Sequence, residues 1–261
     1  MSYSQAIQYN MREFIAFTGA GILEDGKSVF VGTGLPMIAG ILAQKTHAPN
    51  LLIIFEAGGV GPILPELPIS VGQSLTCHRG VAASSMHDVM SACQAGFIDY
   101  GFLGGAQIDM FGNINTTCIG DHELPKVRLP GSGGANDIAS FAHKTIIIAA
   151  SQSKRTFVNK LDFLTTPGYL DGPGAREKAG LPLNTGPYRV VTQLACFGFD
   201  EKSKRLKLIS LHPGVTVEEV QDNCGFDIII PQKYTVSPEP SEKDLHILRN
   251  EIDPTGIIIG K

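Results

Sequence analysis

The sequence lacks the features that would tie the protein to a membrane or to nucleic acid. No apolar run approaches the roughly 20 residues that cross a bilayer, and the first two dozen residues carry charges where a secretory signal has a continuous apolar stretch. The formal charge of −4 is small for 261 residues, and both signs are scattered along the chain. We therefore expect a cytoplasmic protein with no membrane and no nucleic acid among its partners.

Metal-ligating patterns are also missing. The five cysteines are odd in number and widely spaced, without a Cys-x-x-Cys pair or a histidine at a zinc-ligand interval: Cys77, Cys93, Cys118, Cys196 and Cys224. The seven histidines form no His-x-x-x-His or Glu-x-x-His pair, and no serine stands in a Gly-x-Ser-x-Gly elbow. We expect reduced core thiols, no metal site and no serine-hydrolase motif.

Glycine, by contrast, is abundant, and many of the 30 glycines directly follow short β-branched runs. Such placement is typical of turns at strand ends, where α/β proteins bind ligands. The pattern predicts strands over 27–31, 51–55, 98–109, 144–150, 188–194, 195–199 and 205–212, with a hairpin turn at Gly112-Asn113 leading into 114–120. It predicts helices up to about Leu23, from the turn at 32–36 to Ala43, over 84–95, after the loop 131–137, and over 216–224 and 241–252. We interpret residues 1–261 as one α/β domain without a linker, with an antiparallel portion late in the chain.

Glu56 is the most informative single residue. It ends the apolar run 51–55 and is followed at once by Ala57-Gly58-Gly59. A partly desolvated carboxylate is a better nucleophile, and a glycine turn lets a substrate approach it closely. The alternative is a strand-end acid that pairs with a surface lysine or caps the next helix, and such acids are common.

Three glycine-rich loops are weaker candidates. In the loop 131–137, Gly131, Gly133 and Gly134 lead into a helix start, so free backbone N–H groups there could bind a phosphate or an oxyanion. The loop matches neither the phosphate-loop nor the dinucleotide pattern, and a plain tight turn with a helix cap remains open. Gly32 and Gly34 in GTGLP, and Gly105 and Gln107 in GGAQID, are similar cases for which close strand-to-helix packing is the alternative.

Taken in order, these segments resemble the class I coenzyme A transferases, and among them the β subunits of glutaconate CoA-transferases. The segments that carry the resemblance are GTGLP, HAPN-LLIIFEAG, GGAQIDMFGNINTTCIGD, GSGGAND, KRTFVNKLDFLTTPGYLDGPGAREKAGLP and EIDP, which span nearly the whole chain. In this family a glutamate followed by a small residue and a glycine forms the covalent intermediates, and Glu56-Ala57-Gly58 matches it. Glutaconate transferases usually have serine where Ala57 stands, a departure that bears on the substrate more than on the reaction.

The resemblance implies an open, largely parallel α/β fold and an active site shared with a homologous α subunit. It assigns the loop that meets the thioester oxyanion and coenzyme A to Gly133, Gly134, Ala135 and Asn136, with Gly32, Gly34, Gly58, Gly105 and Gln107 in neighbouring active-site loops. It implies a CoA thioester and a carboxylic acid, such as the dicarboxylate glutaconate, as substrates and no further cofactor.

Two alternatives stay open. Relatives of this fold act on CoA thioesters as hydrolases, decarboxylases or ring-opening C–C hydrolases, and they tend to lack the glutamate that is retained here. A non-catalytic subunit that only binds coenzyme A is the other.

Overall fold

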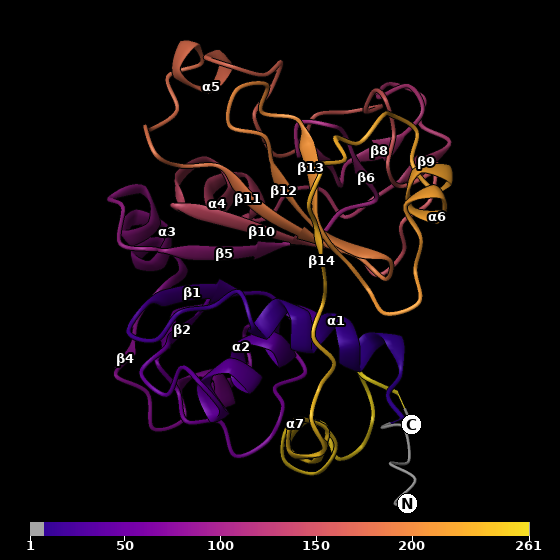
Figure 1. Cartoon of the computed structure of the whole chain (residues 1–261). Helices are drawn as coiled ribbons and strands as arrows, with labels where there is room; N and C mark the ends of the chain where they lie inside the picture. Colours follow the sequence, from indigo (N-terminus) through magenta and orange to yellow (C-terminus); the bar gives the residue numbers. More distant parts are fainter. Residues whose placement is uncertain (1–7, 261) are drawn as a thin grey trace, which may run out of the picture.

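A ten-stranded mixed sheet organises the molecule (Figure 1), whose residues 8–260 are described by the computed structural model. Five neighbouring strands, in the order β2-β1-β5-β10-β11, are parallel, while β12 and β13 continue the sheet antiparallel to them. This confirms the predicted α/β class, with its open, mainly parallel sheet and its antiparallel portion late in the chain. The strands in spatial order are β14 (Thr235–Val236), β13 (Leu206–Leu211), β12 (Ala195–Phe199), β11 (Pro187–Val191), β10 (Lys144–Ile148), β5 (Tyr100–Leu103), β1 (Ser28–Val31), β2 (Leu52–Phe55), β3 (Gly59–Val60) and β4 (Ala82–Ala83).

Helices flank this sheet, and two small hairpins stand apart from it. The hairpins pair β6 (Gln107–Ile108) with β7 (Ile114–Asn115) and β8 (Cys118–Ile119) with β9 (Val127–Arg128). The helices are α1 (Met11–Ala20), α2 (Leu35–Lys45), η1 (Ser74–Cys77), α3 (Met86–Gln94), α4 (Ala135–Phe141), α5 (Ala175–Lys178), α6 (Val217–Asp222), α7 (Glu242–His246) and η2 (Ile247–Ile252). Each predicted helix is present, although the first residues of the predicted N-terminal helix lie outside the described residues.

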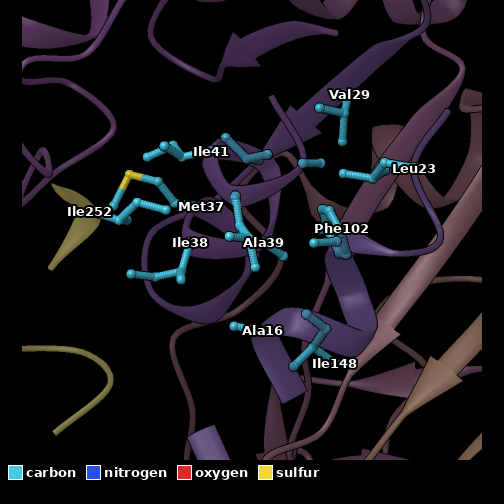
Figure 2. Close-up of a cluster of buried hydrophobic side chains, with 14 of the residues drawn as sticks. Ala16, Leu23, Val29, Met37, Ile38, Ala39, Ile41, Phe102, Ile148 and Ile252 are labelled. Carbon is cyan, nitrogen blue, oxygen red and sulfur yellow. The ribbon is translucent and has the colours of Figure 1, made fainter. Parts of the chain in front are cut away.

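The sheet separates two hydrophobic cores, because successive side chains of a strand point to opposite faces. Val29 and Val31 of β1 face a core that is covered by α1, α2 and the C-terminal helices, and part of it is drawn in Figure 2. Phe30 of the same strand faces the second core, to which α3, α4 and α6 contribute. Burial on both faces explains why β1 and β2 read as continuous apolar runs rather than as alternating ones.

Two predicted strands were wrong in extent, and local packing explains both breaks. Residues 98–109 divide into β5 and β6 at Gly104-Gly105, where a Cβ on Gly105 would lie 2.0 Å from Ile114 Cγ2, so the chain leaves the main sheet there. Residues 114–120 divide into β7 and β8 because the Asn115 carboxamide accepts hydrogen bonds from the N–H groups of Thr117 and Cys118. An asparagine side chain that bonds the backbone two residues on forms a turn rather than a strand.

The C-terminal helices are tied to α1 by an ion pair between Glu13 and Arg249. Glu13 is 1% exposed, and it accepts hydrogen bonds from the Arg249 guanidinium and from the N–H of Asn10. Burial alone would raise the pKa of Glu13, but the bonds from Arg249 and Asn10 outweigh it, so its pKa lies below the ordinary value of 4.5. Its ionised form therefore stabilises the fold.

Arg249→Ala is expected to lower the free energy of unfolding by about 2 kcal/mol, because it leaves the buried Glu13 carboxylate without its cation. A group with a lowered pKa contributes stability that is present above its unfolded pKa and lost as pH falls through its folded pKa. The difference between wild type and variant in urea unfolding should thus persist at neutral pH and shrink below about pH 4. Lys45→Ala, which removes a surface pair with Glu251, is the control and should cost under about 1 kcal/mol. Equal effects of the two substitutions would contradict this role for Glu13.

Candidate active site

Glu56 lies at the carboxyl edge of the parallel strands. It directly follows β2, and because Val31 pairs with Phe55, Gly32 stands beside it at the end of β1. The chain runs from β1 to β2 on one side and reaches β5 on the other side of β1, so the strand order reverses here. Open α/β sheets bind their ligands at such a reversal, at the carboxyl ends of the strands.

The glycine loop 131–136 meets Glu56 at this edge. The backbone N–H of Gly134 donates a hydrogen bond to Glu56 Oε1 at 3.1 Å. Glu56 is half-buried, and within residues 8–260 it forms no ion pair, so the surface-lysine alternative does not apply. The capping alternative applies in a modified form, since Gly134 is the N-cap residue of α4.

Gly134 is glycine for reasons of space rather than of backbone strain. Its φ of −76° is open to any residue, but a Cβ would lie 2.4 Å from Met90 Cε and 2.9 Å from Glu56 Oε1. Gly131 and Gly133, by contrast, have positive φ angles of 93° and 51°. The Gly133 N–H has no acceptor within the described part of the chain. The loop thus presents one N–H that is bonded to the carboxylate and one that is unpaired.

The rest of the loop is held by neighbouring segments. The hydroxyl of Thr116 donates to the carbonyl of Gly131, and the N–H of Gly131 donates back to the Thr116 carbonyl. The Asn136 carboxamide donates to the carbonyl of Thr165 at 2.9 Å, and the N–H of Ala135 bonds the carbonyl of Ser132. Asn136 and Ala135 therefore shape the loop through contacts within the chain.

Among the other predicted site residues, Gly58 and Gly105 are explained by packing. A Cβ on Gly58 would lie 2.0 Å from the Ser84 carbonyl oxygen, and the φ of Gly58 is 113°. Gly105 packs against Ile114, as described above. Both flank the edge that carries Glu56, and their lack of a side chain lets neighbouring groups approach.

Gln107 is buried, and both ends of its amide are bonded within the chain. Its Nε2 donates to Asp162 Oδ2, and its Oε1 accepts from Asn115 Nδ2 and the Asp162 N–H. Gly32 and Gly34 lie at the end of β1, where a Cβ on Gly32 would meet nothing within 4 Å. Gly34 has a φ of 86° and begins α2.

Met90, Thr116 and Thr165 also shape the site, although no local pattern pointed to them. Met90 fills the space beside Gly134, while the Thr165 hydroxyl accepts from the N–H of Thr116. These contacts depend on segments that meet only in the folded chain.

The arrangement places a carboxylate beside backbone N–H donors at an open edge. A carboxylate can attack a carbonyl carbon, and N–H groups at this position can stabilise the oxyanion that forms. Within residues 8–260 no three His, Cys, Asp or Glu side chains are grouped as metal ligands, and no helix is long and apolar enough to cross a membrane.

Comparison with known proteins identifies related chains. The family model described as coenzyme A transferase matches residues 15–223. The glutaconate CoA-transferase of Acidaminococcus fermentans contains a relative, its B-type subunit, that is 39% identical over 252 residues, which cover 94% of this chain and 93% of that protein. A crystal structure of that transferase superposes with a TM-score of 0.91 at 38% identity, over 97% of this chain and 98% of the other.

Two further relatives differ in the activity that their names give. The B-type subunit of the 3-oxoadipate CoA-transferase from Pseudomonas knackmussii is 40% identical over 242 residues, or 92% of each chain. The cholesterol ring-cleaving hydrolase IpdB subunit from Rhodococcus jostii is 27% identical over 227 residues, which cover 85% of this chain and 83% of the relative.

Proposed function

Because this chain belongs to the coenzyme A transferase family, we propose that it is the nucleophile-bearing subunit of a heteromeric CoA-transferase. It moves coenzyme A between an acyl-CoA and a free carboxylic acid, with Glu56 as the group that carries the intermediates. The observation that carries the proposal is the contact between Glu56 Oε1 and the N–H of Gly134 at the open edge of the sheet.

The first half of the reaction breaks the donor thioester. A Glu56 oxygen attacks the thioester carbonyl carbon, the C–S bond breaks, and coenzyme A leaves as a thiolate beside a mixed anhydride. The thiolate then attacks the Glu56 carbonyl carbon, the anhydride C–O bond breaks, and the donor acid leaves as a carboxylate. Glu56 is now a thioester of coenzyme A, and the acceptor acid runs the same steps in reverse.

Gly134 suits the second attack. When the thiolate adds to the Glu56 carbonyl carbon, negative charge develops on an oxygen that already accepts the Gly134 N–H. The unpaired N–H of Gly133 is the second proposed donor. Donors fixed in place before charge develops stabilise a transition state without the cost of reorganisation.

A second, homologous chain completes the site in this proposal. Both transferase relatives described above are B-type subunits, and Glu56 here lies at an edge of the sheet rather than in an enclosed cleft. Exposed apolar side chains near this edge, among them Val81 at 77% and Met86 at 55%, provide a surface that a partner can cover. The α-type chain would supply the remaining wall of the cleft.

Glutaconate and 3-oxoadipate, named for two relatives, are both dicarboxylates, and they are the first acids to test. Hydrolysis of a CoA compound is the second candidate, because one relative is named as a ring-cleaving hydrolase. In that reaction Glu56 would act on a water molecule instead of carrying coenzyme A.

The test is mass spectrometry of the complex, co-expressed with an α-type chain, after incubation with acyl-CoA and rapid quenching. We expect a CoA adduct on the peptide that contains Glu56, because its carboxylate forms the thioester. The chain expressed alone should give none. An adduct on another residue, or turnover to free acid and free coenzyme A without any adduct, would favour the hydrolase.

A further inference from the structure

A cavity of about 460 Å³ opens at the same edge of the sheet as Glu56. Residues of three segments line it: Thr33-Gly34 after β1, the stretch 66–73, and the C-terminal turn 252–258. On one side Thr33 follows Gly32, the residue beside Glu56. On the other side Gly72 approaches Ala57, since a Cβ on Gly72 would lie 4.0 Å from the Ala57 Cβ. The cavity is therefore bounded by two loops that flank Glu56.

The lining is mainly apolar and contains no Lys, Arg or His. Leu67, Ile69 and Ile258 are among its walls. One of its two acids, Asp253, is 2% exposed, and its oxygens already accept the N–H groups of the turn that follows it. The other acid, Glu66, is exposed at the rim. Ligand pockets of 300–1,000 Å³ are typically lined in this way, with few polar groups.

The chemistry of a CoA thioester narrows what can enter. The ADP portion is anionic and finds no cation in this cavity. The pantetheine arm carries two amides that need hydrogen-bond partners, whereas the side-chain carbonyl of Gln73 already accepts the N–H of Ile69 and Asp253 is occupied. Burying unpaired amides is costly, and burying hydrocarbon is favourable.

We propose that this cavity holds the uncharged carbon chain of the acyl group that Glu56 carries, an assignment that rests on the proposed function. The C-terminal turn forms its outer wall, since the Asn10 carboxamide donates to the carbonyl of Ile259 and the Arg12 guanidinium to that of Ile258. A second carboxylate on the substrate would take its cation from the partner chain.

The test narrows the cavity and compares acids of increasing length in the two-subunit complex. For wild type we expect kcat/KM to rise about fourfold for each added methylene from propionate to hexanoate, or about 60-fold over three. Ile69→Trp, at a side chain that is 79% exposed, should remove most of this gain while changing kcat/KM for propionate by less than about twofold. Leu67→Trp, deeper in the wall, should do the same. Leu183→Trp, at an apolar residue that is 70% exposed and lies outside this cavity, should leave the whole series unchanged.

Equal losses for propionate and hexanoate would overturn the assignment in favour of the pantetheine arm. No loss in either tryptophan variant would overturn it as well, and would mean that the partner chain covers the cavity. A wild-type complex that transfers coenzyme A to no acid would contradict the proposed function instead. The cavity is then tested by fluorescence, because this chain has no tryptophan of its own. A shift in emission on adding hexanoyl-CoA to Ile69→Trp, but not to Leu183→Trp, would support the cavity, and no shift would contradict it.

Discussion

Glu56→Gln is expected to lower the rate of exchange between acyl-CoA and free acid by on the order of 10⁴-fold or more, because both covalent intermediates form on this carboxylate. The amide keeps the size of the side chain and can still accept from the N–H of Gly134, so folding and assembly with the partner should be unaffected. Steady-state exchange of labelled acid into acyl-CoA measures the loss.

Glu56→Asp keeps the charge but withdraws the carboxylate by one methylene. A displacement of about 1 Å can cost about 100-fold, so this variant should retain a trace of activity. Glu201→Gln, at an exposed acid distant in sequence, controls for the change of net charge. Exchange in Glu56→Gln at the wild-type rate would refute the nucleophile assignment outright.

Gly134→Ala should reduce turnover by on the order of 100-fold or more, the effect of losing one oxyanion donor. Its φ of −76° accepts alanine without strain, but the new methyl group would lie 2.9 Å from Glu56 Oε1 and force the carboxylate away from the N–H. The thermal midpoint should therefore change far less than kcat. Parallel measurement of kcat and of thermal unfolding separates the two effects.

The methyl group would also lie 2.4 Å from Met90 Cε, and a double variant distinguishes the two clashes. Gly134→Ala with Met90→Ala relieves the contact with methionine and should remain impaired. Gly21→Ala is the matched control, since its φ is −62° and its Cβ would find only ordinary contacts. Recovery of turnover in the double variant would assign Gly134 to packing alone.

The central strands could be predicted because their signal is local. The runs that form β1, β2 and β10 are apolar on both faces and end close to glycine or alanine, so burial and termination are both written in consecutive residues. The β6–β7 pair is different, since it is held by bonds to distant segments, such as the Ile108 N–H to the Thr156 carbonyl and the Ile114 N–H to that of Thr166. No pattern within a few residues encodes such contacts.

The site shows the same division. Glu56 and the glycine loop were each recognisable from their own neighbours, but the two stand 78 residues apart, and the residues alone did not predict that they touch. Gln107 illustrates the opposite limit. It stands in a distinctive glycine-rich motif, and the structure gives its whole amide to Asp162 and Asn115, neither of which stands beside it in the chain.

The sheet ends on both sides in strands of two residues, β4 and β14, both exposed. Unpaired strand edges are templates for aggregation, and natural sheets often blunt them by keeping the edge strands short. So brief an edge offers few main-chain groups to another sheet, and the partner chain would therefore have to dock through side chains instead of by extending the sheet. A cell that makes this subunit in excess of its partner would thus accumulate a chain with exposed apolar side chains but little capacity to nucleate fibrils along its edges.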